Sequence, residues 1–400
     1  MEHFLATRLQ NIKPSPTLQV TAKAASLRAA GQDVISLGAG EPDFDTPEYI
    51  KSAAINAIHT GKTKYTSVDG TIDLKQAICK KLKIENNLAY TPKQISVGCG
   101  AKQVIFNAFM ATLNPGDEVI IPAPYWVSYP DMVVMCEGTP VIVICPAHDS
   151  FKLSPESLQQ AITDKTKWLI LNSPSNPTGA AYSKDEMYGL AQVLLAHQHV
   201  NIICDDIYEH IIFDGFEFCT IAQVEPRLYD RVLTVNGVSK AYAMTGWRIG
   251  YGAGNPSLIE AMCTIQSQIT SNPCSISQAA AAIALTQKPE PFQAEVFSRR
   301  RDLVVAMLNE INGIVCQKPQ GAFYVFPSCE ALIGKTTTDG KKINSCLDFS
   351  NFLLEKALVA VVPGEAFGMP NFFRISYATA DETLVEACKR IKSACELLID

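Results

Sequence analysis

The chain has 400 residues, of which 47% are hydrophobic, and its formal net charge at pH 7 is −6. These values indicate a globular protein of one large or two ordinary domains, and the acidic balance argues against binding nucleic acid by neutralising phosphates. No apolar run approaches a membrane span and no signal peptide is visible, so we expect a cytoplasmic protein. The 13 cysteines are scattered without metal-ligand spacing, which favours free thiols and argues against a metal site.

The first two thirds of the chain alternate between helical and strand patterns. Helices are predicted at 103–113, 154–163 and 184–198, and short β-rich runs at 117–122, 138–145, 167–174, 201–206 and 231–237. Strands separated by segments of helix length require parallel crossovers. The pattern therefore predicts an α/β fold with a doubly wound, mostly parallel sheet.

The character of the chain changes after residue 272. Helices are predicted at 275–287, 292–311 and 381–399, and strands of a second sheet at 321–327, 357–364 and 372–378. A proline break, KPEP, separates the first two of these helices. We therefore predict a large α/β domain over residues 48–289 and a smaller α+β domain made of residues 1–47 and 290–400.

Two cations lie among small and apolar residues in NGVSKAYAMTGWRIGYGAGNP, residues 236–256. Burial penalises the charged form of a lysine, and a neutral Lys240 amine can attack an aldehyde. Arg248 carries a permanent, forked donor that suits a phosphate. An aldehyde that carries a phosphate is pyridoxal 5′-phosphate. A salt-bridged pair at a domain seam explains this segment alone equally well.

Two further segments point to a small anionic ligand. Asp205 ends the strand run NIICD, and ligands of open parallel sheets bind at the carboxyl ends of the strands. Glycines precede a helical pattern in SVGCGAKQVIFNAF, residues 96–109, where the N–H groups of a helix start can form an anion site. A carboxylate that caps the next turn is the alternative for Asp205 or Asp206.

Eight motifs occur in a family-specific order. They are AGEPDFDTP, KTKY, GDEVIIPAPYWVSYP, NSPSNPTGA, CDDIYEH, SKAYAMTGWRIGY, VVPGEAFG and FRISYA. The ordered set covers essentially the whole chain and resembles the class I aminotransferases, which are fold-type I pyridoxal-phosphate enzymes. The resemblance implies that fold, pyridoxal 5′-phosphate as the cofactor, and transamination between an amino acid and a 2-oxo acid.

The resemblance also implies roles around the cofactor ring. Lys240 matches the lysine that holds the cofactor covalently and then moves a proton as general base and acid. Asp205 matches the acid that pairs with the pyridine nitrogen and keeps it protonated. Tyr208 and Asn176 match donors to the phenolic oxygen, and Trp126 the aromatic that stacks on the ring. Trp126 and Asn176 are expected to contact the substrate as well.

A second set of matches concerns the phosphate. Gly100, Ala101 and Lys102 match the phosphate-binding loop of the family, and Arg248 matches its phosphate-binding arginine. Tyr65 resembles a tyrosine that reaches the phosphate of the neighbouring subunit, which implies a homodimer with shared active sites. An ordinary loop tyrosine is the alternative for this residue.

The substrate matches point to dicarboxylates. Arg374 matches the arginine that grips the substrate α-carboxylate bidentately, and Gly40 the glycine whose backbone contacts the same group. Lys13 and Lys102 match lysines of a bacterial-type subgroup of aspartate aminotransferases, some of which resemble aspartate/prephenate aminotransferases. We therefore expect aspartate and 2-oxoglutarate as substrates, with glutamate and prephenate as further candidates. Lys13 is also compatible with a solvated lysine before a proline.

One position departs from the family pattern, and several functions stay open. Gly237 stands where many relatives carry a serine that touches the phosphate, so one contact is expected to be missing. The motifs bind a cofactor without fixing the outcome, which leaves an aminotransferase for alanine or aromatic amino acids, or a β-lyase, as alternatives. We do not expect a transcription regulator, because such a protein would need a DNA-binding module ahead of the family match, and the match begins by Lys13.

Overall fold

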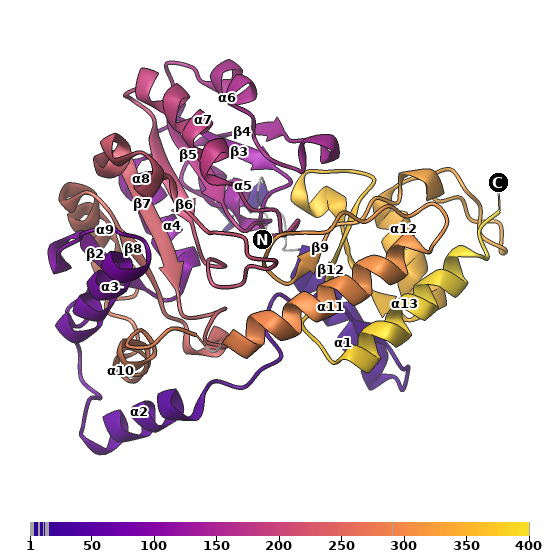
Figure 1. The fold of residues 1–400 in the computed structure, drawn as a ribbon, viewed down its shortest axis with the longest axis horizontal. Helices are drawn as coiled ribbons and strands as arrows, with labels where there is room; N and C mark the ends of the chain where they lie inside the picture. Colours follow the sequence, from indigo (N-terminus) through magenta and orange to yellow (C-terminus); the bar gives the residue numbers. More distant parts are fainter. Residues whose placement is uncertain (1–3, 7–8, 11, 13–15, 290, 400) are drawn as a thin grey trace.

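The computed structural model of the chain describes residues 4–6, 9–10, 12, 16–289 and 291–399. Lys13 therefore lies outside the described residues. A large sheet with its helices forms one body, and a smaller body of short strands and helices lies beside it (Figure 1).

The larger sheet has seven strands in the order β2-β8-β7-β6-β5-β3-β4. They are β2 (Ile95–Gly98), β3 (Glu118–Ala123), β4 (Thr139–Ile144), β5 (Thr166–Asn172), β6 (Asn201–Asp205), β7 (Val232–Gly237) and β8 (Gly250–Ala253). All neighbouring pairs from β7 to β4 are parallel, whereas β8 runs antiparallel to β7 and β2. The prediction of a doubly wound, mostly parallel sheet is confirmed. Sequence analysis missed β2 and β8, because four residues that include glycine carry no clear strand pattern.

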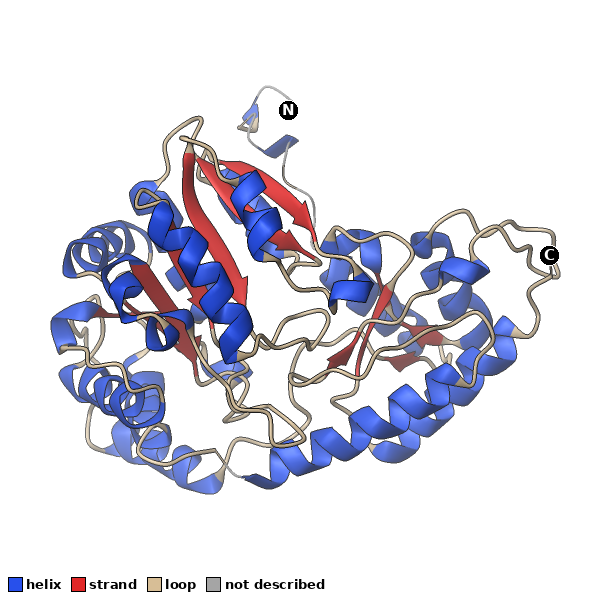
Figure 2. Cartoon of the chain, turned by 45° about the horizontal axis from the view of Figure 1, so that its top comes forward, coloured by secondary structure: helices blue, strands red, loops and turns tan. Residues whose placement is uncertain are grey.

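Helices lie on both faces of this sheet (Figure 2). The helices of the larger body are α2 (Glu48–His59), which packs mainly against α10, α3 (Ile72–Glu85), α4 (Ala101–Thr112), α5 (Ser128–Met135), α6 (Pro155–Ala161), α7 (Lys184–Ala196), α8 (Ile221–Val224), α9 (Pro256–Ile269) and α10 (Ser275–Ala284). The start of α7 shows how the local sequence sets these helices. The Ser183 hydroxyl accepts from the Glu186 N–H while the Glu186 carboxylate accepts from the Ser183 N–H, which satisfies two otherwise unpaired donors.

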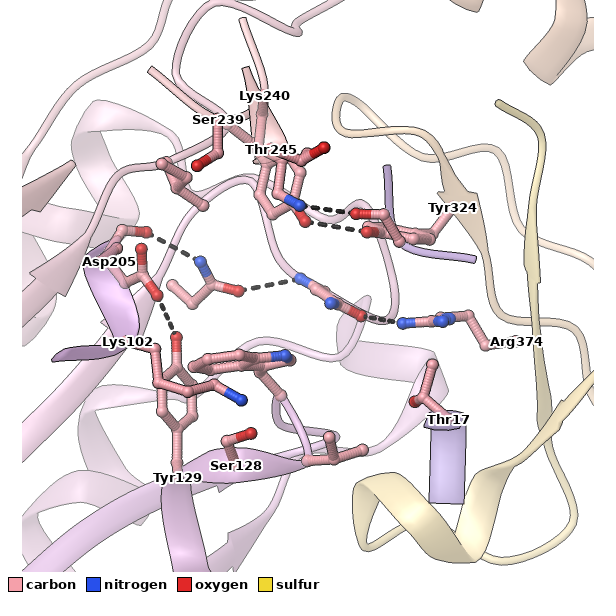
Figure 3. A pocket seen from close by; sticks show the side chains of 18 of the residues that line it. Thr17, Lys102, Ser128, Tyr129, Asp205, Ser239, Lys240, Thr245, Tyr324 and Arg374 are labelled. Carbon is pink, nitrogen blue, oxygen red and sulfur yellow. Dashed lines mark hydrogen bonds between the residues drawn. The ribbon is translucent and has the colours of Figure 1, made fainter. Parts of the chain in front are cut away.

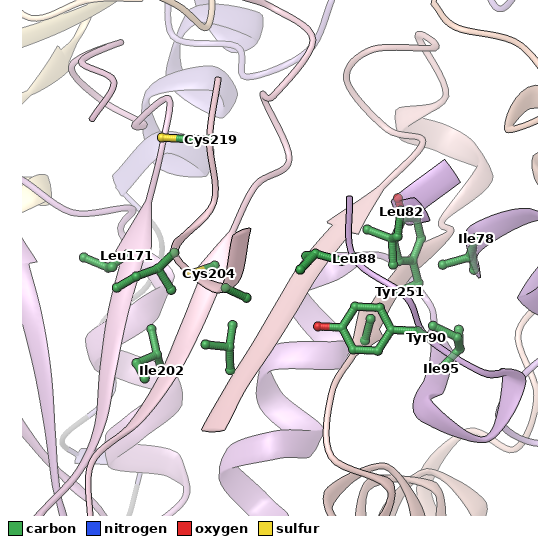
Figure 4. Packing of buried hydrophobic residues seen from close by; sticks show 14 of the residues in the cluster. Ile78, Leu82, Leu88, Tyr90, Ile95, Leu171, Ile202, Cys204, Cys219 and Tyr251 are labelled. Atoms are coloured by element: carbon green, nitrogen blue, oxygen red, sulfur yellow. The ribbon is translucent and has the colours of Figure 1, made fainter. Parts of the chain in front are cut away.

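The core divides into two layers at the sheet. Leu169 and Leu171 of β5 face one hydrophobic cluster, and Trp168 and Ile170 face the other, because successive strand residues point to opposite faces. Figure 4 shows part of the first cluster, with Leu171 beside Cys204 of the neighbouring strand. Each such buried side chain stabilises the fold by about 1.5–3 kcal/mol. Packing on both faces therefore holds the central strands, and with them their carboxyl ends, in position.

The smaller body contains short strands in two groups. They are β1 (Ile35–Ser36) with β10 (Val359–Ala360), and β11 (Val362–Pro363), β12 (Phe373–Ser376) and β9 (Tyr324–Val325). The helices are α1 (Pro16–Ala29), α11 (Pro291–Asn309), α12 (Cys346–Phe352) and α13 (Asp381–Cys395). The single strand expected at 357–364 splits in two, because β10 pairs with β1 while β11 pairs with β12.

Helix α11 and a loop from the N-terminal part join the two bodies. Figure 2 shows the long α11 running along one side of the molecule. Arg300 of α11 donates two hydrogen bonds to Asp43, at 2.8 and 2.9 Å, and one to Asp381 at 3.1 Å. The domain boundaries at 47/48 and 289/290 fall beside the starts of α2 and α11 and remain predictions.

All thirteen cysteines are free, as expected. Among the described residues, no helix combines the length and apolar character that a membrane crossing requires.

Candidate active site

A cavity lies at the carboxyl ends of the central strands, between the two bodies (Figure 3). The predicted residues that line it are Gly40, Ala101, Lys102, Trp126, Asn176, Asp205, Tyr208, Lys240, Arg248 and Arg374. They come from segments more than 300 positions apart in the sequence, so only the tertiary fold assembles them. Gly100 lies directly beside this group, whereas Tyr65 lines a different, more open hollow.

Lys240 and Arg248 both belong to the loop that leaves β7 and returns as β8. The loop passes over the carboxyl end of β7, which points both side chains at the cavity. Arg248 has a left-handed backbone with φ of 56°, a conformation that costs a non-glycine residue free energy and often occurs at functional sites. Its guanidinium donates to the carbonyl oxygens of Thr245 and Cys99, at 3.0 and 3.2 Å.

The Lys240 ammonium is held in place by the N-terminal part of the chain. Its Nζ donates to the carbonyl oxygen of Gly40 at 2.6 Å. Burial lowers the pKa of Lys240 to about 8, the positive charges of Arg248 and Arg374 act in the same direction, and Glu41 opposes them. At mildly alkaline pH a large fraction of the Lys240 side chains is therefore neutral. The neutral amine is the form that can act as a nucleophile or base.

Asp205 is the last residue of β6, and only one of its two carboxylate oxygens accepts a hydrogen bond from the described residues. Its Oδ2 accepts from the Tyr129 hydroxyl at 2.6 Å, and its main-chain carbonyl accepts from Asn172 Nδ2 at 2.8 Å. The buried Oδ1 finds no donor among the described residues. Burial raises the pKa of Asp205 to about 6, against the hydrogen bond from Tyr129. An unmatched, buried oxygen in a cavity wall indicates a ligand that donates a hydrogen bond or a proton.

The start of α4 forms a compact anion site together with Arg248. The first N–H groups of a helix have no partner within the helix and attract negative charge. Gly100 precedes α4 with φ of 86°, and a β-carbon at this position would press against the Arg248 guanidinium. A β-carbon at Gly250 would collide with the backbone of Gly100 and Ala101. Both glycines therefore allow the arginine and the helix start to lie together.

Arg374 is a buried cation without an anionic partner among the described residues. The side chain lies on β12 and is only 2% exposed. It donates to Asn176 Oδ1 at 2.8 Å and to the Gly38 carbonyl oxygen at 2.7 Å, and its Nε finds no acceptor in the part of the chain that the structure describes. Burial lowers the pKa of this guanidinium. A buried charge with neutral partners is unfavourable on its own, so the geometry favours a carboxylate ligand at this position.

Two aromatic side chains shape the cavity wall next to the cations. Lys102 Nζ lies 4.8 Å from the centre of the Trp126 ring, and burial followed by the charge of Arg248 lowers the pKa of Lys102. Trp126 packs edge-on against Tyr129 at 5.2 Å. The tryptophan thus presents a flat apolar surface beside the carboxylate of Asp205, in the arrangement that a flat heterocycle would need.

The comparison with known families agrees with this geometry. The profile of the family described as aminotransferase class I and II matches residues 32–391 of the chain. The chain belongs to this family.

Relatives and solved structures support the assignment of this aminotransferase. The aspartate/prephenate aminotransferase of Cereibacter sphaeroides is 61% identical over 395 residues, covering 98% of both chains. The crystal structure of the aspartate aminotransferase from Rhizobium meliloti has a TM-score of 0.96 at 56% identity, covering 99% of both chains. The Thermus thermophilus aspartate aminotransferase with maleate has a TM-score of 0.91 at 42% identity, covering 98% of this chain and 99% of that one. The resemblance and the fold-type I architecture are confirmed.

Tyr65 does not reach the active site of its own chain. It is 91% exposed and lies beside Asn272 and Cys274 in a separate hollow. Its proposed contact with the phosphate of a neighbouring subunit remains a prediction that needs the second subunit of this aminotransferase.

The absence of serine at position 237 has a packing reason in this aminotransferase. A β-carbon at Gly237 would lie 2.9 Å from the Ile249 carbonyl oxygen and 3.1 Å from the Gly250 Cα. The close approach of β7 and β8 therefore excludes a larger residue without a local shift. Ser239, two positions later, lines the cavity instead.

Seven polar residues of the cavity wall were not predicted as site residues from the sequence. They are Thr17, Ser128, Tyr129, Asn172, Ser239, Thr245 and Tyr324. Tyr129 follows Trp126 by three positions, and its N–H donates to the Trp126 carbonyl oxygen at 3.0 Å in the turn that leads into α5. This spacing could have identified it. No local pattern marks Tyr324, because its neighbours in GAFYVFP read as an ordinary buried strand.

Proposed function

We propose that the protein is a pyridoxal-phosphate-dependent transaminase that moves the amino group of L-aspartate to 2-oxoglutarate. The observation that carries the proposal is the buried guanidinium of Arg374, which has no anionic partner among the described residues. It lies in the same cavity as Lys240 and as Asp205, whose Oδ1 likewise has no hydrogen-bond donor there. This set provides a carboxylate site, a titratable amine and an acidic partner for a ring nitrogen. The names of the relatives support the same chemistry.

The described residues fit the cofactor that the family implies. Asp205 Oδ1 offers an unmatched acceptor to a protonated ring nitrogen, and Trp126 offers a flat apolar surface. The start of α4 and the Arg248 guanidinium offer donors to a phosphate. When bound, pyridoxal 5′-phosphate supplies an aldehyde carbon that carries the amino group and a ring that accepts electrons from the substrate.

Lys240 is the proposed proton carrier of the reaction. With the cofactor bound, the Lys240 amine would take the proton from the substrate α-carbon as the general base and would hold it as the general acid for the return transfer. The pKa of about 8 places this base close to neutral conditions, where a general base works well. Arg374 holds the α-carboxylate and so orients the α-hydrogen toward the amine.

The preference for dicarboxylates rests on Lys102 and on the relatives. Lys102 provides a second cation in the cavity, and Thr17 of α1 lines the same wall. Maleate, the molecule in the Thermus thermophilus structure, is a four-carbon dicarboxylate like aspartate. The further role proposed for Lys13 concerns a residue outside the described ones.

A homodimer with shared active sites is part of the same proposal. Tyr65 is exposed, and apolar side chains on α2, α9 and α10 are also exposed, namely Ile55, Ile58, Ile269 and Ile283. Contact with a second copy would cover these side chains and bring Tyr65 to another cavity. Sedimentation analysis is expected to give twice the monomer mass.

A panel of amino donors with 2-oxoglutarate tests the function. Aspartate is expected to have the highest kcat/KM among aspartate, alanine and phenylalanine, by about 10- to 10²-fold, since a charged partner at a second cation contributes about 1.5–3 kcal/mol. Prephenate replaces 2-oxoglutarate in a second series with aspartate or glutamate as the donor. A strong preference for alanine or phenylalanine, or release of ammonia instead of a new amino acid, would contradict the proposal.

A further inference from the structure

One hydrogen bond in the cavity wall joins the two bodies of the molecule. The hydroxyls of Tyr208 and Tyr324 lie 2.9 Å apart. Figure 3 labels Tyr324 in the cavity wall, on the same side as Arg374. Tyr208 follows β6 of the larger sheet, and Tyr324 lies on β9 of the smaller one. Both side chains are buried and both line the cavity. Sequence analysis assigned a role to Tyr208 only.

Tyr324 is fixed by more than this hydrogen bond. The Arg374 guanidinium lies 4.6 Å from the centre of its ring, and a β-carbon at Gly40 would lie 3.1 Å from its hydroxyl. Its ring is fully buried and also packs against Phe323. The hydroxyl therefore cannot swing away from Tyr208 without moving the residues expected to hold the substrate carboxylate.

The number of protons decides the direction of this bond in the loaded protein. Each tyrosine hydroxyl has one proton to donate and lone pairs to accept. If Tyr208 donates its proton to an acceptor in the cavity, its oxygen can only accept from Tyr324. If Tyr208 instead donates to Tyr324, no Tyr208 proton points into the cavity.

We propose that Tyr324 is a positioning residue of the active site, whose hydroxyl donates to the Tyr208 hydroxyl and thereby directs the Tyr208 proton into the cavity. The inference rests on the proposed function, because the acceptor is the phenolic oxygen of the cofactor. Linked hydroxyls strengthen each other as donors, so Tyr324 increases the donor strength of Tyr208 without touching the cofactor itself.

The pH dependence of the visible absorption of the cofactor-loaded protein provides the readout. A weaker donor leaves more negative charge on the phenolic oxygen, which then holds a nearby proton more tightly. Tyr324→Phe is therefore expected to raise the pH midpoint of the absorption change by about 0.3–1 unit, the equivalent of one neutral hydrogen bond. The charged groups that face the two hydroxyls are Arg374 and Asp205, with Lys240 next to them, and all three are kept in this variant.

Tyr377→Phe is the matched control. Tyr377 is also fully buried in the smaller body, and its hydroxyl donates to the Ala322 carbonyl oxygen at 3.1 Å rather than to a residue of the cavity. The control variant loses one buried tyrosine hydroxyl and is expected to leave the midpoint unchanged. An equal shift in Tyr377→Phe would mean that the effect of Tyr324→Phe comes from altered packing, and this result would overturn the proposal.

A double-mutant cycle with Tyr208→Phe separates positioning from direct action. If Tyr324 acts through Tyr208, the double variant has the midpoint of Tyr208→Phe alone. The proposal is overturned if the Tyr324→Phe shift persists in full in the Tyr208→Phe background, or if Tyr324→Phe alone gives no shift. A wild-type protein that shows no cofactor absorption would instead contradict the proposed function, so the two failures are distinguishable.

Discussion

The two sides of the cavity are built in different ways. On the larger sheet, Asp205 and Lys240 follow strands that are buried on both faces. On the smaller side, Arg374 and Tyr324 stand on strands of four and two residues, and Gly40 lies in a loop. The two groups whose pKa values are shifted toward neutral pH, about 6 for Asp205 and about 8 for Lys240, both belong to the larger body.

The difference indicates a division of labour between the two bodies. Proton transfer needs groups that change charge near neutral pH, and these groups lie at the ends of the longer strands, β6 and β7. Recognition of a carboxylate needs a permanent charge, which Arg374 provides from the side that is less extensively supported. Substitutions on the larger sheet should therefore act mainly on kcat, and substitutions on the smaller side mainly on KM.

Lys240→Ala should abolish the proton transfer that the larger body is proposed to provide. Removal of the amine removes both the covalent attachment and the general base, and kcat is expected to fall by about 10⁴-fold or more. Single-turnover assays with aspartate and the loss of the visible absorption band measure both effects. Lys102→Ala is the control for loss of a cavity lysine, and a comparable loss of absorption there would contradict the special role of Lys240.

Asp205→Asn keeps the size of the side chain but removes its charge. An amide cannot keep the ring nitrogen protonated, so kcat is expected to fall by about 10²–10³-fold, the usual effect of losing one preorganised electrostatic partner. Steady-state kinetics at saturating cofactor measure the change. The neighbouring Asp206→Asn is the control, because Asp206 is buried but does not line the cavity, and it should retain most of the activity.

Arg374→Lys tests the recognition side. A lysine keeps the positive charge but loses the planar fork, and KM for aspartate is expected to rise by about 10–100-fold with a smaller change in kcat. A titration of maleate binding by the loaded protein provides an independent measurement. A fall in kcat with KM unchanged would contradict the assignment of carboxylate recognition to the smaller body.

Lys102→Ala sharpens the comparison within the substrate. The side-chain carboxylate of aspartate loses one cation, and kcat/KM for aspartate is expected to fall by about 10-fold. The value for alanine should change less, because alanine has no second carboxylate. The ratio of the two values is the quantity to measure, and an unchanged ratio would separate Lys102 from substrate selection.

The stability of the cofactor-free protein gives the smallest effect. Because the pKa of Asp205 is raised from 3.8 to about 6 in the fold, its stabilising contribution is present below pH 4 and is lost as pH rises through 6. Asp205→Asn should therefore raise the unfolding free energy at pH 7.5 by about 1–3 kcal/mol, with little change at pH 4. Urea titrations at both pH values test this, and equal stabilisation at both would contradict the ionisation argument.

Part of the site could be predicted because its signals are local. Asp205 ends a short apolar strand, and Lys240 and Arg248 are cations in an otherwise small and apolar segment. The family resemblance then supplied the expected partners, including Arg374. The strands β2 and β8 could not be recognised, because their pairing depends on residues more than 140 positions apart, as between Ser96 and Gly252.

The contacts that set the pKa values and hydrogen bonds of the site could not be predicted from the sequence. The Tyr129 hydroxyl on Asp205 and the pair of Tyr208 and Tyr324 join segments separated by 76 and 116 positions. Tyr324 does not stand out from an ordinary core residue by its neighbours, and only the spacing from Trp126 marks Tyr129. The shifts in the pKa values of Asp205 and Lys240 likewise follow from burial, which exists only after the two bodies have come together.

The sequence by itself determined the alternation of strands and helices, and with it the sheet edge at which ligands bind. It also placed an amine, an acid and two arginines in motifs that identify a family. Tertiary structure alone decided which oxygen of Asp205 is free, what surrounds Arg374, and why residue 237 is glycine. The physical reason is that periodicity and side-chain chemistry are properties of neighbouring residues, whereas desolvation, close approach and hydrogen-bond pairing depend on distant segments packed together.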